Sequence, residues 1–165
     1  MFSSEEIKER GLGKKSENKK FFDRIKRKKP KNLDEKINEL HQEEFEKIDC
    51  LSCANCCKTT SPIFRGVDIS RISKHLGMKE IDFIESNLYK DNEGDYVLKK
   101  SPCLFLDEKN YCKIYENRPL ACREYPHTNR KRFIQILPLT LKNTEICPAT
   151  FNIIENLKKI ENQLK

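Results

Sequence analysis

Eight cysteines are the residues of this chain whose type and spacing could do chemistry. Four of them, Cys50, Cys53, Cys56 and Cys57, form the string CLSCANCC. Thiols spaced three residues apart in a loop can reach the same side, so Cys50, Cys53 and Cys56 could hold one metal centre. For Cys57 three roles stay open: a ligand of another centre, a nearby thiol, or a packed core residue.

The remaining cysteines lie downstream, at Cys103, Cys112, Cys122 and Cys147, and are the available donors of further ligands. Thiolate-rich sites suit zinc, iron–sulfur clusters and Cu(I) alike. Two zinc sites would use all eight thiolates, whereas one [4Fe-4S] cluster would use four. Packing as small buried residues explains one or two cysteines better than a dense cluster. A C-x-x-C redox motif would need a thioredoxin-like βαβ pattern, which we do not find here. The sequence therefore predicts a thiolate-bound metal centre and leaves the identity of the metal open.

The chain begins MFSSEEIKERGLGKK, without an apolar segment typical of a secretory signal. No apolar run approaches the roughly 20 residues of a membrane span. We therefore expect a cytoplasmic protein with no membrane span. Cytoplasmic thiols are kept reduced, which favours metal binding over four disulfides.

Two amphipathic segments would position the CLSCANCC string. Asn32 and Glu35 resemble a capping box, and the apolar stripe after them predicts a helix that delivers the chain to Cys50. His41 lies on this stripe and is expected to be a partly buried, hydrogen-bonded residue. Beyond the string, Asp68 can cap a helix that Gly77 ends, and a second stripe follows, so a helix hairpin is expected.

Short strands should carry two of the downstream cysteines. Residues 96–99, 103–106 and 111–115 read as strands, with a turn at 107–110 that places Cys103 and Cys112 on facing strands. Cys122 falls in a short helical turn, flanked by Arg118 and Arg123, which can bind carbonyls or acidic groups around it. Residues 132–137 read as another strand, and the last segment as a helix. The fold class is thus α+β: a small single domain, helices plus a small antiparallel β-sheet around a cysteine-ligated metal centre.

The net charge of +7 lies entirely in residues 1–32, which hold 12 Lys and Arg against 5 Asp and Glu. With few large apolar residues, this segment is expected to be a disordered basic tail, followed by a cysteine-cluster metal-binding domain at 33–165. The tail could attract a nucleic acid through counterion release. A solvated, solubilising tail is the simpler interpretation.

The strings CLSCANCC, DISRISKHLGM and CLFLDEKNYCKIYENRPLACREYP together resemble the YkgJ-like cysteine-cluster family of CxxCxxCC proteins, described as zinc- or iron-chelating. The resemblance covers about residues 45 to 150 and implies a metal-binding domain whose biological role is undefined. Ala54 stands where the family often has glycine, and Lys79 where a capping Ser or Thr would be expected. The candidate metal ligands that the resemblance implies are Cys50, Cys53, Cys56, Cys57, Cys103, Cys112, Cys122 and Cys147.

Two other functions stay open beside a metal-binding module with an unknown protein partner. Flagellin lysine N-methylases carry a similar cluster, so a metal-dependent enzyme is one alternative, although the chain lacks a glycine-rich S-adenosylmethionine loop. A metal-sensing nucleic-acid-binding regulator is the other, because ISRISKHLGMKEIDFIESNL reads like a helix-turn-helix. Glu80, Asp82 and Glu85 in its second helix would repel a phosphate backbone.

Overall fold

The computed structural model describes residues 2–165, which divide into two compact units. The first unit comprises residues 2–55 and 126–165, and the second comprises residues 56–125. Helices dominate both, and the one described sheet is a two-stranded antiparallel pair, which confirms the α+β expectation. Within the described residues, no helix is both long enough and apolar enough to span a membrane.

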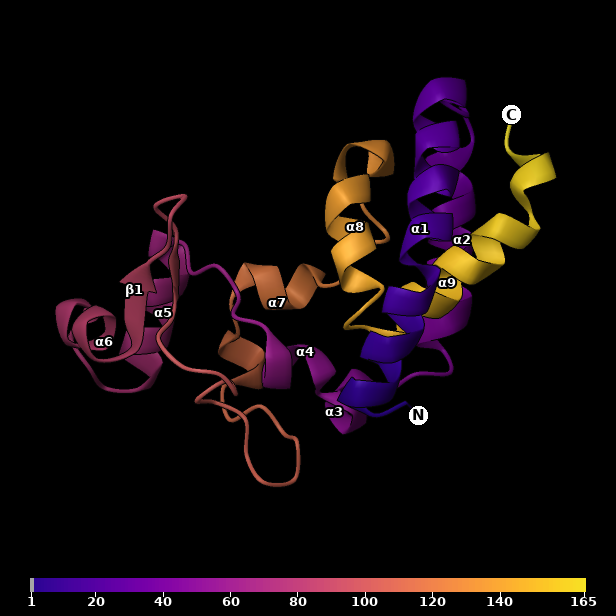
Figure 1. Ribbon diagram of the computed structural model, residues 1–165. Coiled ribbons are helices and arrows are strands. Elements are labelled where there is room, and N and C mark those ends of the chain that lie inside the picture. Colours follow the sequence, from indigo (N-terminus) through magenta and orange to yellow (C-terminus); the bar gives the residue numbers. More distant parts are fainter. Residues whose placement is uncertain (1) are drawn as a thin grey trace. The chain divides into compact units, whose positions relative to one another are not determined.

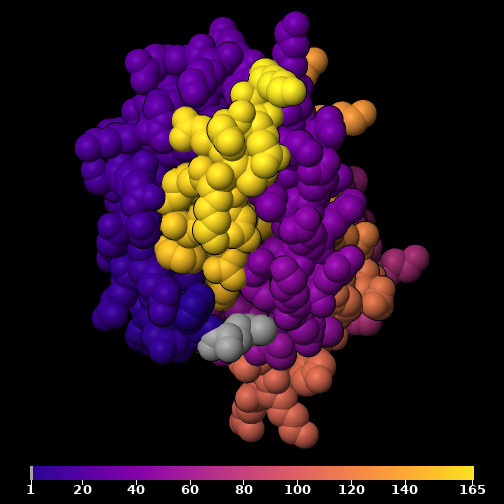
Figure 2. Space-filling model, turned by 90° about the vertical axis from the view of Figure 1, so that its right-hand side faces the viewer, coloured from indigo at the N-terminus to yellow at the C-terminus, as the bar shows by residue number. Residues whose placement is uncertain are grey.

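The first unit is built from helices α1 (Ser4–Lys28), α2 (Leu33–Phe45), α8 (Leu137–Asn143) and α9 (Pro148–Lys159). Helix α9 packs against both α1 and α2, and its yellow segment lies between them in Figure 2. Phe21, Ile37, Phe133 and Ile153 are fully buried in the core that these helices share. The short helix α3 (Cys50–Cys53) and the 3-10 turns η2 (Phe133–Ile136) and η3 (Glu161–Gln163) complete the unit.

The disordered basic tail expected over residues 1–32 is not what the structure shows, because α1 occupies most of that segment. Ile7, Gly11, Asn18, Phe21, Phe22 and Ile25 recur at helical spacing and form its buried face. Ser3 and Glu6 form a capping box, and Lys26, Arg27 and Lys28 lie in the last turn, where cations favour the helix dipole. The prediction of disorder was wrong because it relied on the average composition of the segment, which does not show that its few apolar residues lie on one helix face.

The second unit contains α5 (Gly66–His75), α6 (Glu80–Asn87), β1 (Leu88–Lys90) and β2 (Tyr96–Leu98) (Figure 1). Gly77 has a φ of +67°, which favours glycine and ends α5, so the expected helix hairpin is confirmed. Leu88 pairs with Leu98 and Lys90 with Tyr96 across the sheet. The chain continues from α4 (Asn55–Thr59), and η1 (Tyr115–Asn117) and α7 (Leu120–Glu124) follow the sheet.

Three expected strands are absent from the described residues. Residues 103–106 and 111–115 do face each other across the turn, through one bridge between Leu106 and Cys112. The Asp107 N–H donates to the Tyr111 carbonyl and the Lys113 N–H to the Phe105 carbonyl, but the pairing does not extend into a ladder. Residues 133–136 form η2, since Phe133 and Leu137 lie four residues apart and face one core. The Asp34 carboxylate accepts the N–H groups of Arg132 and Phe133 at the start of that turn.

Candidate metal centre

The CLSCANCC string is two short helices separated by a left-handed residue. The Asp49 side chain caps α3 by accepting the Leu51 N–H at 3.0 Å. Ala54 has a φ of +51°, and its N–H donates to the Cys50 carbonyl at 3.0 Å, so α3 ends there. The backbone thus adopts at Ala54 the conformation that glycine would favour. Cys50 and Cys53 precede this break, and Cys56 and Cys57 follow it in α4.

The first unit holds three of the candidate ligands, Cys50, Cys53 and Cys147. Cys147 is the N-cap residue of α9, and its Sγ accepts the Thr150 N–H at 3.5 Å. Burial is the main cause that raises the pKa of the Cys147 thiol, and Cys53 contributes a smaller electrostatic effect in the same direction. Cys53 and Cys147 are therefore electrostatic neighbours within this unit.

The second unit holds the other five cysteines, and short backbone contacts position four of them. The Cys103 N–H donates to the Cys57 carbonyl at 2.8 Å. Cys112 lies in the single bridge with Leu106, whose N–H donates to the Cys103 carbonyl at 3.0 Å. Cys103 and Cys112 also pack against the core of Phe64, Phe83 and their neighbours. The expected short helical turn with Cys122 is confirmed as α7.

The four thiols of Cys57, Cys103, Cys112 and Cys122 interact electrostatically in every one of their pairings. Burial first, and then the charges of the other three thiols, raise the pKa of Cys122 to about 12. Burial is also the main cause that raises the pKa values of Cys103 and Cys112. Burial and the neighbouring charges both raise these pKa values. A cation among the thiols would lower them, because it stabilises the thiolate form.

Cys57 differs from its neighbours in its ionisation. A hydrogen bond with the Cys56 side chain is the main cause that lowers the pKa of Cys57, to about 7. Cys57 would therefore be the first of the four to become a thiolate, the form that binds metals. Among residues 2–165, no three His, Cys, Asp or Glu side chains are already arranged to hold a metal ion, so binding would draw the thiols closer together.

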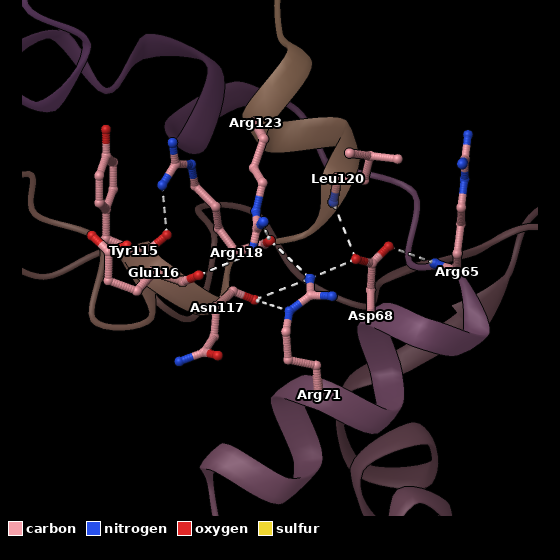
Figure 3. A network of polar contacts seen from close by, with 9 residues as sticks. All are labelled: Arg65, Asp68, Arg71, Tyr115, Glu116, Asn117, Arg118, Leu120 and Arg123. Carbon is pink, nitrogen blue, oxygen red and sulfur yellow. Dashed lines mark hydrogen bonds and ion pairs between the residues drawn. The ribbon is translucent and has the colours of Figure 1, made fainter.

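A polar network fixes the segment that carries Cys122 (Figure 3). The buried Asp68 carboxylate accepts the Arg65 N–H, the Leu120 N–H and a bond from the Arg71 guanidinium. Arg71 also donates to the carbonyls of Asn117 and Arg118. Asp68 lies inside α5, at its third residue, rather than before its start as the sequence suggested.

Arg118 and Arg123 bind carbonyls around Cys122, which is one of the two roles expected of them. The Arg118 guanidinium donates to the Tyr115 carbonyl at 2.6 Å and lies over the Tyr115 ring. Arg123 donates to the carbonyls of Glu116 and Arg118 at 2.9 and 3.1 Å. Arg118 has a minor effect that lowers the pKa values of Cys112 and Cys122.

Sequence reasoning missed Arg71, which is the residue that joins Asp68 to the segment before α7. Its only sequence signal is a position three residues after Asp68 on one helix face. His41 has the role expected of it: its Nδ1 lies 2.7 Å from Thr128 Oγ1, its ring packs on Phe45, and burial lowers its pKa.

Comparisons with known proteins match the region that contains all eight cysteines. A family model named CxxCxxCC, described as "Putative zinc- or iron-chelating domain", matches residues 49–148. "Uncharacterized protein MJ0661" of Methanocaldococcus jannaschii is 29% identical over 86 residues. The match covers 50% of this chain and 46% of that relative, so the chain spans about half the length of the curated relative it matches. No solved structure matches. Neither match names a methylase or a nucleic-acid ligand. The chain belongs to the CxxCxxCC family.

Proposed function

We propose that this protein binds zinc or iron through cysteine thiolates, and that Cys57, Cys103, Cys112 and Cys122 form its principal centre. The observation that carries the proposal is that these four thiols, all within one compact unit, lie close enough for each to affect the ionisation of the others. Four thiolates are a complete ligand set for a structural zinc ion and for a [4Fe-4S] cluster. The donor chemistry therefore fits either group.

Residues of the second unit would bind the metal and set how its affinity depends on pH. Cys57 supplies the first thiolate, and metal binding releases the protons of the remaining thiols, so affinity should rise with pH. Zinc would stabilise the unit, whereas a cluster would add electron transfer. In the first unit, Cys53 and Cys147 are neighbours, and Cys50 joins them as a candidate donor for a second ion.

Metal analysis of protein purified without oxygen tests the proposal and separates its two forms. Zinc without colour would support a structural site, and iron with acid-labile sulfide and visible charge-transfer bands would support a cluster. Protein that contains neither metal and takes up neither added zinc nor added ferrous iron would contradict the proposal.

Single serine substitutions test the assignment of the principal centre. Cys122→Ser should remove one of four ligands and greatly weaken metal binding at this centre. Cys147→Ser is the matched control, because it removes a buried cysteine of the first unit and should leave the principal centre loaded. Metal affinity is measured by competition with a chromophoric chelator. Equal affinity of Cys122→Ser and the unmodified protein would contradict the assignment.

A further inference from the structure

We infer that Asp68 and Arg71 are positioning residues that set the place of Cys122 in the metal centre, a role that rests on the proposed function. The two side chains belong to α5, yet their hydrogen bonds converge on the backbone just before and at the start of α7 (Figure 3). Neither the family match nor the relative assigns a role to either residue.

Helix α7 cannot hold its own position, because it has only five residues. Isolated helices this short are unstable in water. Its N-cap residue is Pro119, which makes no side-chain cap. The Cys122 and Arg123 N–H groups bond to the Pro119 carbonyl, and the Leu120 N–H is left for another acceptor. Asp68 Oδ1 supplies that acceptor at 3.1 Å, from 52 residues earlier in the sequence.

Arg71 connects Asp68 to the residues that lead into α7. Its Nη2 donates to Asp68 Oδ1 at 2.6 Å and to the Arg118 carbonyl at 3.0 Å, with longer bonds to the Asn117 carbonyl. The planar guanidinium can span these acceptors together, which an ammonium group cannot. The pair thus fixes both the entry to α7 and its first residue.

The Asp68 carboxylate is 1% exposed, and each of its oxygens accepts a backbone N–H. A buried carboxylate without these partners would be costly, so its position and that of α7 are strongly coupled. Cys122 lies two residues after Leu120, on the single turn that this carboxylate caps. Metal–thiolate distances stay within about 0.2 Å of their usual values. Loss of a group that orients a metal ligand by a direct hydrogen bond typically costs about 10- to 100-fold in metal affinity, and Asp68 orients Cys122 through the turn that bears it.

Cobalt(II) binding to the full-length chain tests the inference, because the absorption of a cobalt–thiolate centre depends on the number of thiolates. Asp68→Asn keeps the size of the side chain but replaces one acceptor with a donor that faces an N–H. We expect its cobalt affinity to fall by about 10- to 100-fold. Its spectrum should shift toward that of Cys122→Ser, a change that a purely structural role would not produce.

Asp91→Asn is the matched control, since the Asp91 carboxylate also accepts two backbone N–H groups in the second unit, but in the turn between β1 and β2. It should bind cobalt as the unmodified protein does. Leu120→Pro is a second test that leaves Asp68 and Arg71 in place. Proline is well tolerated at the first residue of a helix, and it removes the N–H that Asp68 accepts. Leu120→Ala, which keeps that N–H, controls for loss of the leucine side chain. Leu120→Pro should weaken cobalt binding, as Asp68→Asn does.

Unchanged cobalt affinity and spectrum in Asp68→Asn and Leu120→Pro would overturn the inference, even if both variants unfold more readily. That result leaves the proposed function intact, because the unmodified protein would still bind cobalt. Failure of the unmodified protein to bind cobalt, zinc or iron is the separate outcome that removes the proposed function, and the positioning role with it.

Discussion

At the scale of single residues, the same side chain has opposite properties at neighbouring positions of the second unit. The pKa of Cys57 is lowered to about 7, whereas that of Cys122 is raised to about 12. The cause in the first case is a hydrogen bond from an adjacent thiol, and in the second it is burial. A cysteine pattern in a sequence identifies donors, but it does not reveal which donor ionises first.

Among the four thiols of the principal centre, alkylation of the metal-free protein should therefore be fastest at Cys57. At pH 7 about half of Cys57 is thiolate, against about 3% of a thiol with an ordinary pKa of 8.5. The less basic thiolate is about fivefold less nucleophilic, so the net advantage is about threefold. Brief iodoacetamide treatment from pH 5 to 9, followed by peptide mass spectrometry, measures it. Cys57 should react with a midpoint near pH 7, and Cys122 should stay unmodified.

The control for this prediction is Cys56→Ala, which removes the hydrogen bond that lowers the pKa of Cys57. The reaction midpoint of Cys57 should then move to higher pH, toward the value of an ordinary thiol. A midpoint that does not move would show that the Cys56 thiol is not the cause of the lowered pKa.

At the scale of elements, the sequence predicted helices well where an apolar stripe stood among polar residues. Helices α2, α5, α6, α7 and α9 lie where expected, although α2 begins at Leu33 without a side-chain cap from Asn32. The Asn32 side chain instead bonds to Gln163 and Lys165, contacts that are remote in sequence. The two strands expected at 103–106 and 111–115 are wrong, because short runs on either side of a turn do not distinguish a ladder from one isolated bridge.

Helix α1 provides an element-scale prediction, because Gly11 allows it to approach the end of α8. A Cβ added at Gly11 would lie 2.6 Å from the Glu145 Cα and the Thr144 carbonyl oxygen, which are backbone atoms and cannot turn away. Gly11→Ala should therefore lower the free energy of unfolding by about 1–3 kcal/mol, as overpacking typically does. Urea denaturation followed by circular dichroism measures the change.

Gly13 on the same helix is the matched control, since no atom lies within 4 Å of an added Cβ there. Gly13→Ala should raise the free energy of unfolding by about 0.5–1 kcal/mol, because alanine loses less conformational entropy in a helix. If Gly11→Ala were equally stabilising, α1 would not pack closely against the residues after α8 in solution.

At the scale of the whole molecule, the chain does not divide at residue 32 into a basic tail and a cysteine domain, as the sequence predicted. Residues 2–55 join residues 126–165 in one unit, and the cysteines are divided between that unit and residues 56–125. Composition could not reveal this, because the net charge of residues 1–32 says nothing about which face of a helix the apolar residues occupy. The eight candidate ligands were readable from the sequence, whereas their grouping by unit required the fold.

This division predicts where a bound metal protects the backbone. If the principal centre is formed by cysteines of residues 56–125, metal binding stabilises that unit by about 2.7 kcal/mol when free metal is 100 times its Kd. Amide hydrogen exchange through opening of the unit should then slow about 100-fold. The Cys103 and Lys113 N–H groups, which donate to the Cys57 and Phe105 carbonyls, are suitable reporters. The Lys29 N–H at the end of α1 serves as the reference in the first unit.

Hydrogen exchange with and without zinc, read by mass spectrometry on peptides from both units, measures this effect. Peptides from 98–118 should gain protection, while those from 20–32 should change much less, since the metal does not bind the groups that hold α1. In Cys122→Ser the gain should disappear at the same zinc concentration. Protection confined to the first unit would contradict a centre built from Cys57, Cys103, Cys112 and Cys122, and would instead favour Cys50, Cys53 and Cys147 as the ligands that bind first.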